Sequence, residues 1–97
     1  EKYMIESSSY RLSGRVDGTN AEHYETEILD LLKKAGQSFL IDLSDLKYIS
    51  SIGLRIFLKV AKALKSDNKK LVLAKPNPAI LDLLVMSGFD KIIEIQH

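Results

Sequence analysis

The chain has 97 residues, of which 45% are hydrophobic and 28% are charged, and it contains no cysteine. This length and composition are typical of one globular domain with a single core, which we expect to span residues 1–97. No apolar run approaches the roughly 20 residues that span a bilayer, so we expect no membrane segment. The lack of cysteine excludes a disulfide framework and thiolate chemistry, and it fits a reducing, cytoplasmic compartment.

The net charge of +1 is unevenly distributed along the chain. Residues 1–45 hold nine acids and five bases, whereas residues 46–97 hold four acids and nine bases. The basic half lacks interleaved aromatic residues and clustered arginines, so we do not expect direct binding of nucleic acid. This half also carries basic residues at helical spacing, at Arg55, Lys59, Lys62 and Lys65. The pattern fits either the solvated face of an amphipathic helix or a docking surface for an acidic protein.

The first half of the chain predicts two strands, a helix and a third strand. Residues 2–6 and 10–16 have strand character, with Ser7-Ser8-Ser9 as the turn between them. Thr19 to Glu22 fits a capping box that starts a helix, and Gly36 is expected to stop it. Residues 39–43 then predict a short buried strand that ends at the turn signal Ser44-Asp45.

The second half continues the alternation of helices and strands. Residues 54–65 repeat apolar side chains at helical spacing, and residues 70–74 form a strand whose central residues are all apolar. Asn77-Pro78 opens a third helix that Gly88 stops, and residues 92–95 form a last strand. The order β-β-α-β-α-β-α-β predicts an α/β domain with a mixed, mostly parallel sheet and helices packed on it.

Two hydroxyls and a glycine lie where the central strand gives way to the second helix, in Ser50-Ser51-Ile52-Gly53. Open α/β sheets place their sites beyond the carboxyl ends of strands, and helix N-termini favour anions. One serine is expected simply to cap the helix. The functional alternative is that one of them accepts a phosphate, which the helix dipole would tolerate and which would change what the surface binds.

We find no pattern of catalytic or metal-binding residues, and we predict neither an enzyme nor a bound cofactor. His23 and His97 have no neighbour at ligand spacing, and the glycines form no phosphate-binding loop. Asp42 and Asp45 could be a carboxylate pair, but we expect Asp42 to satisfy local backbone donors and Asp45 to make a turn.

Three segments together resemble the STAS domain family, in particular bacterial anti-sigma factor antagonists. They are Ile41 to Leu54, the run Leu12-Ser13-Gly14-Arg15-Val16-Asp17, and Met86 to Ile93. The family pattern of aspartate, serine, small residue, glycine and leucine aligns on Gly53-Leu54. It places the phosphorylated serine at Ser51, with Ser50 at the aspartate position and Ile52 at the small one.

The resemblance implies a partner-switching function. The unphosphorylated antagonist would bind an anti-sigma factor that is also a serine kinase, phosphorylation would release it, and a PP2C-type phosphatase would reset it. Beside the phosphorylation site Ser51, it implies a partner-binding surface on the end of the second predicted strand and the second helix. That surface comprises Asp17, Ser50, Ile52, Gly53, Leu54, Arg55 and Lys59.

Two alternatives belong to other functional classes. The first is a phosphoaspartate receiver domain with Asp42 as the acceptor, but the chain lacks an acidic pair after its first strand and is short for that fold. The second is a STAS scaffold that is not phosphorylated, such as a module of an anion transporter or of a lipid-transport complex.

Overall fold

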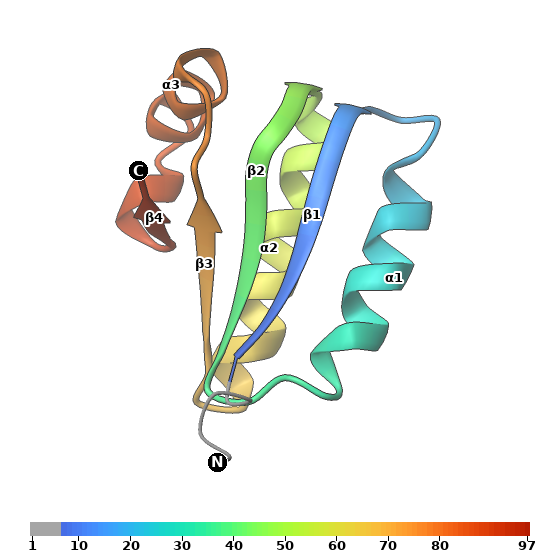
Figure 1. Ribbon diagram of the computed structural model, residues 1–97, viewed down its shortest axis with the longest axis vertical. Coiled ribbons are helices and arrows are strands. Elements are labelled where there is room, and N and C mark those ends of the chain that lie inside the picture. The colour runs from blue at the N-terminus through green and yellow to red at the C-terminus, as the bar shows by residue number, and fades with distance from the viewer. Residues whose placement is uncertain (1–6) are drawn as a thin grey trace.

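The computed structural model describes residues 7–97 and contains one parallel sheet with three helices (Figure 1). The strands are β1 (Ser7–Val16), β2 (Ser38–Ile49), β3 (Lys70–Ala74) and β4 (Glu94–Gln96). The helices are α1 (Ala21–Leu32), α2 (Ser51–Ser66) and α3 (Pro78–Met86), followed by the short 3-10 helix η2 (Phe89–Lys91). The order of helices and strands over these residues confirms the predicted α/β class.

The four strands lie side by side in the order β1-β2-β3-β4, and every neighbouring pair is parallel. The antiparallel first strand predicted at residues 2–6 lies outside the described residues. The predicted turn at Ser7-Ser8-Ser9 is wrong, because these residues pair with Ser38, Phe39 and Leu40 as the start of β1. Serine favours turns only weakly, and here the sheet supplies the backbone partners that a turn would otherwise provide.

Strand β2 is longer than predicted and runs through Ser44-Asp45 to Ile49. The register with β1 shifts twice, and in each interval β2 contains one residue more than β1. From the first shift onward its buried side chains, Leu43, Leu46 and Ile49, therefore recur every third residue rather than every second. The Asp42 carboxylate accepts a 2.9 Å hydrogen bond from the Ser44 backbone N–H beside the first shift, so the apparent turn signal is a bulge within a strand.

The helices and the sheet share one apolar core. Ile28 of α1 and Val60 of α2 belong to the same buried cluster as Phe39 and Leu73 of the sheet. Phe57 of α2 meets Phe89 of η2 edge to face, with ring centroids 6.5 Å apart, so the C-terminal part of the chain closes on the same core. This core fixes the start of α2 relative to the sheet.

The helix ends follow the predicted signals in α2 and α3 but not in α1. Asn77 Oδ1 accepts a 2.9 Å hydrogen bond from the Ile80 N–H and Pro78 follows it, as predicted, while Gly88 adopts φ +78° after α3. The predicted capping box at Thr19 is wrong: α1 begins at Ala21, and no side chain caps it. The N-cap position belongs to the following residue, Asn20, so the Thr19 oxygen is not placed to accept from the first turn, and the Thr19 hydroxyl donates to Asp17 Oδ1 at 2.6 Å within the loop.

Candidate functional site

The carboxyl ends of β1 and β2 meet at the top of Figure 1, where α2 begins behind them. Ser50 joins the three elements. Its backbone N–H donates to Val16 O at 2.9 Å, and its Oγ accepts a 3.2 Å hydrogen bond from the Gly53 N–H as the N-cap of α2. The prediction that one serine caps this helix is confirmed, and that serine is Ser50.

Ser51 is the first residue of α2 and is exposed. Among residues 7–97 its hydroxyl has no hydrogen-bond partner, and it stands at the end of the helix where backbone N–H groups lack intrahelical acceptors. The two adjacent hydroxyls therefore differ: the Ser50 oxygen is engaged in the fold, and the Ser51 oxygen is available at the surface.

Gly53 lets α2 start close against the sheet. A Cβ at this position would lie 2.7 Å from Ile49 Cγ1 and 2.8 Å from Val16 Cγ1, both of them buried and branched. The glycine is thus required by close packing rather than by an unusual φ. Gly53 is itself buried, so it can shape the predicted partner-binding surface but presents no side chain to it.

Ile52 and Leu54 flank this glycine with different exposure. Ile52 is 50% exposed, and its Cδ1 lies 3.4 Å from the position of a Cβ on Gly18 in the β1–α1 loop. Leu54 is half-buried against the core. The exposed Ile52 is therefore a large apolar side chain directly beside Ser51. Such side chains are typical of the centre of a protein interface and are less common on a face that contacts only solvent.

Asp17 organises the β1–α1 loop next to this surface. Its Oδ1 accepts hydrogen bonds from the Thr19 hydroxyl at 2.6 Å and the Thr19 N–H at 2.9 Å, and its Oδ2 lies 3.4 Å from Arg15 Nε. The bonds from Thr19 are the main reason that the pKa of Asp17 lies below its usual value. Asn20 completes the loop by accepting from the Asp17 N–H and donating to Arg15 O, both at 2.9 Å.

Arg15 and Tyr48 add a feature that the sequence did not predict. The Arg15 guanidinium lies 4.2 Å from the centre of the Tyr48 ring, and Tyr48 is 42% exposed. The two residues are cross-strand neighbours only because of the second register shift. To predict this contact from the sequence, one would first have to predict the bulges in β2. The only sequence signal for them is that the apolar residues from Leu43 onward recur every third position.

The predicted basic stripe of α2 is divided by its contacts. Arg55 is exposed and has no acidic partner within the described part of the chain. Lys59 lies 3.2 Å from Glu25 Oε2 and ties α2 to α1, whereas Lys62, one turn further along the helix, borders a cavity. Of the three, only Arg55 is both close in sequence to Ser51 and free of an ion pair.

The acidic pair Asp42 and Asp45 lies within β2 and is structural. Arg11 lies 3.3 Å from both Asp42 Oδ2 and Asp45 Oδ2, so one cation bridges the two carboxylates. The hydrogen bond from the Ser44 N–H is the largest reason that the pKa of Asp42 is lowered. The role predicted for Asp42 is confirmed, while the turn predicted at Asp45 is wrong because Asp45 lies within β2.

Neither a metal centre nor a membrane-spanning helix is found over residues 7–97. No group of three or more histidine or acidic side chains there could hold a metal ion. His23 is exposed and lies 3.4 Å from Glu27 one helical turn away. None of the helices is long and apolar enough to cross a bilayer.

Comparison with known proteins finds one family and a consistent set of relatives. The family model for the STAS domain matches residues 5–97. BtrV of Bordetella bronchiseptica, described as a candidate anti-sigma factor antagonist, is 38% identical over 86 residues, which cover 89% of this chain and 74% of BtrV.

Solved structures have the same fold. The anti-sigma factor antagonist SpoIIAA of Bacillus is 20% identical and has been solved in unphosphorylated and phosphorylated forms. The TM-scores are 0.79 and 0.72, and the matches cover 98% of this chain and 84% and 86% of theirs. The STAS domain of the SulP transporter from Vibrio cholerae is 17% identical, with a TM-score of 0.74 and coverage of 95% and 73%.

Proposed function

Because the chain belongs to the STAS domain family, we propose that it is an anti-sigma factor antagonist whose binding is switched by phosphorylation of Ser51. The observation that carries the proposal is the division of roles at the start of α2. Ser50 is committed to the helix cap, whereas the neighbouring Ser51 hydroxyl is exposed and unbonded within the described chain. The name of BtrV supports the antagonist role.

The partner of the unphosphorylated form is an anti-sigma factor with serine kinase activity. The docking surface is centred on Ser51 and Ile52, with Arg55 at its basic edge. Leu54, Gly53 and Ser50 hold the helix start in place, and Asp17 holds the neighbouring loop. Lys59 contributes less, because its ammonium group already faces Glu25. The protein acts as ligand and kinase substrate in the cytoplasm, and it performs no catalysis itself.

Phosphorylation of Ser51 should stop partner binding without unfolding the domain. The phosphate adds about 1.5–2 negative charges. At a helix N-terminus it meets backbone donors and a favourable dipole, so the effect on folding should be small or stabilising by about 0.3–1 kcal/mol. At a packed interface the same group must lose its water, and an unpaired buried charge costs several kcal/mol.

These magnitudes predict a loss of affinity of about a hundredfold or more, since each factor of ten corresponds to about 1.4 kcal/mol. The measurement is a melting curve and a titration against the cognate anti-sigma factor, with phosphorylated and unmodified protein. A PP2C-type phosphatase should restore binding. A large fall in melting temperature on phosphorylation, or unchanged affinity, would contradict this mechanism.

The acceptor itself is tested by a matched pair of variants. Ser51→Ala should abolish phosphorylation by the cognate kinase and ATP, as read by intact mass and phosphopeptide mapping. Ser50→Asp is the control, because aspartate caps a helix as well as serine does and leaves Ser51 in place. If the phosphate maps to Ser50, the assignment of the two serines is wrong.

The alternative function is a STAS scaffold that is never phosphorylated, as a module of an anion transporter or a lipid-transport complex. The likeness to the SulP transporter domain favours it only at the level of the fold. The two functions differ in one measurement: intact mass after incubation with ATP and the cognate kinase rises by one phosphate for the switch and stays unchanged for the scaffold.

A further inference from the structure

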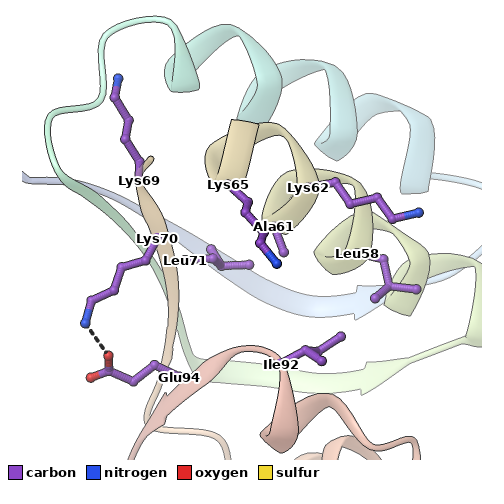
Figure 2. A pocket seen from close by; sticks show the side chains of 9 residues that line it. All are labelled: Leu58, Ala61, Lys62, Lys65, Lys69, Lys70, Leu71, Ile92 and Glu94. Carbon is purple, nitrogen blue, oxygen red and sulfur yellow. Dashed lines mark ion pairs between the residues drawn. The ribbon is translucent and has the colours of Figure 1, made fainter. Parts of the chain in front are cut away.

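A cavity of about 460 Å³ lies between the C-terminal half of α2, strand β3 and the segment around β4 (Figure 2). Its apolar lining comes from Leu58, Ala61, Leu71 and Ile92. The volume is within the range of about 300–1,000 Å³ that small-molecule sites occupy. It is separate from the start of α2, since none of its lining residues belongs to the surface around Ser51.

The charged side chains around this cavity are mostly cations. Four lysines line it together with a single acid, Glu94. Lys70 lies 2.7 Å from Glu94 Oε1, and Lys69 Nζ donates to Ala35 O at 2.7 Å, so both have partners. In Figure 2 the Lys65 side chain extends toward Leu71, while Lys62 extends along α2 above Leu58.

Of the four lysines that line the cavity, Lys62 and Lys65 are the two without a partner among the described residues. Neither ammonium group has an ion pair or hydrogen bond to any of residues 7–97, and both side chains are exposed at the edge of an apolar hollow. The helix dipole favours a cation at Lys65, in the last turn of α2. The dipole does not explain a cation at Lys62, which lies one turn earlier, and it does not explain the cavity between the two lysines and Ile92.

We infer that this cavity binds a small amphipathic anion, with an alkyl or acyl chain over Leu58, Leu71 and Ile92 and an anionic headgroup at Lys62 and Lys65. The exposed Ile92, at 63%, would lose solvent contact on binding. The lysine stems extend the apolar wall while their ammonium groups reach the headgroup. A carboxylate and a phosphate both satisfy this chemistry, and a phosphate is favoured by its larger charge.

The test is a titration of the isotope-labelled chain by nuclear magnetic resonance with octyl phosphate below its micelle concentration. Amide shifts should be confined to the cavity-lining segments of α2, β3 and residues 92–94, and they should saturate. Octanoate should bind more weakly at the same place. Octanol and inorganic phosphate should each fail to saturate, because each lacks one half of the recognised chemistry.

Charge-reversed variants decide whether the lysines take part. Lys62→Glu with Lys65→Glu should weaken binding of octyl phosphate by about tenfold or more, because two attractions become repulsions. The matched control, Lys34→Glu with Lys47→Glu, makes the same change of net charge at exposed sites outside the cavity and should leave affinity unchanged. Ile92→Asp tests the apolar wall, and its exposure makes the substitution compatible with folding.

Three outcomes would overturn the inference. They are shifts spread over the whole surface, equal binding of octanol and octyl phosphate, and equal affinity of the two double variants. Because the titration contains no partner protein and needs no phosphorylation, its result is independent of the function proposed for Ser51.

Discussion

Replacing Gly53 with alanine should destabilise the domain, although alanine is the better helix former. The added Cβ would lie 2.7 Å from Ile49 Cγ1 and 2.8 Å from Val16 Cγ1. Both neighbours are buried and β-branched, so they cannot rotate away freely. Overpacking of this kind costs about 1–3 kcal/mol, and the gain in helix propensity returns at most about 1 kcal/mol.

With the full gain in helix propensity the net loss is up to about 2 kcal/mol, and each kcal/mol lost should lower the melting temperature by about 4–8 °C in a domain of this size. Gly18→Ala is the matched control, since its Cβ would meet only the exposed Ile52 side chain, at 3.4 Å. Thermal and urea unfolding of both variants provides the comparison. A Gly53 variant at least as stable as the wild type would refute the packing argument.

Three further predictions concern acid stability, a helix cap and the docking surface. The pKa of Asp42 lies below 3.8 in the folded state, so its ionised carboxylate stabilises the fold above pH 3.8, and this stability is lost as pH falls through the folded-state pKa. Between pH 5 and acid unfolding, the urea midpoint should therefore fall less for Asp42→Asn than for the wild type. Asn77→Ala removes the bond to the Ile80 N–H and the 3.0 Å bond to Leu46 O, and urea unfolding should show a loss of about 1–2 kcal/mol. Arg55→Glu should slow association with the anti-sigma factor and make the association rate less dependent on salt concentration, whereas Lys34→Glu should do neither. Equal association rates of the two variants in stopped flow would show that Arg55 is not part of the docking surface.

The sequence predicted the features that depend on local signals. A serine cap at Ser50 or Ser51, the Asn77 cap and the Gly88 stop follow from side chains within one turn of the position concerned, and the structure assigns the serine cap to Ser50. The start of α2, which positions the candidate site, was therefore predictable to within a few residues. The assignment of Ser51 as phosphoacceptor came from the family resemblance and stays a prediction.

The errors arose where strand pairing or a neighbouring aspartate changes the role of a residue that has a turn or cap preference. Ser44-Asp45 looks like a turn, yet β1 supplies a ladder on one side and Asp42 satisfies the displaced Ser44 N–H. Thr19 looks like a helix cap, yet the helix starts one residue later with Asn20 at the N-cap, and the Thr19 hydroxyl donates to the Asp17 carboxylate. In both cases an aspartate two residues earlier in the chain accepts the hydrogen bond, and propensity alone does not show whether such a bond belongs to a turn, a bulge or a loop before a helix.

The lysine-lined cavity was beyond sequence reasoning for a different reason. Its walls come from α2, β3 and the residues around β4, which are brought together only by the order of strands in the sheet. In the sequence, Lys62 and Lys65 are indistinguishable from the rest of an amphipathic stripe. Along α2 and around the cavity, the contacts of Lys59, Lys69 and Lys70 distinguish these paired lysines from the unpaired Lys62 and Lys65.

The all-parallel pairing of the described strands has a consequence for how the chain reaches its native state. Ser7 pairs with Ser38, Ser38 with Lys70, and Val72 with Glu94, so every ladder closes across an intervening helix. Because these strands form no hairpin, no pair can begin to form at a tight turn. Each pairing must instead overcome the entropy lost in closing a long loop. We therefore expect the helices to gain structure before the sheet does, and folding to be slower than in a helical bundle of equal length.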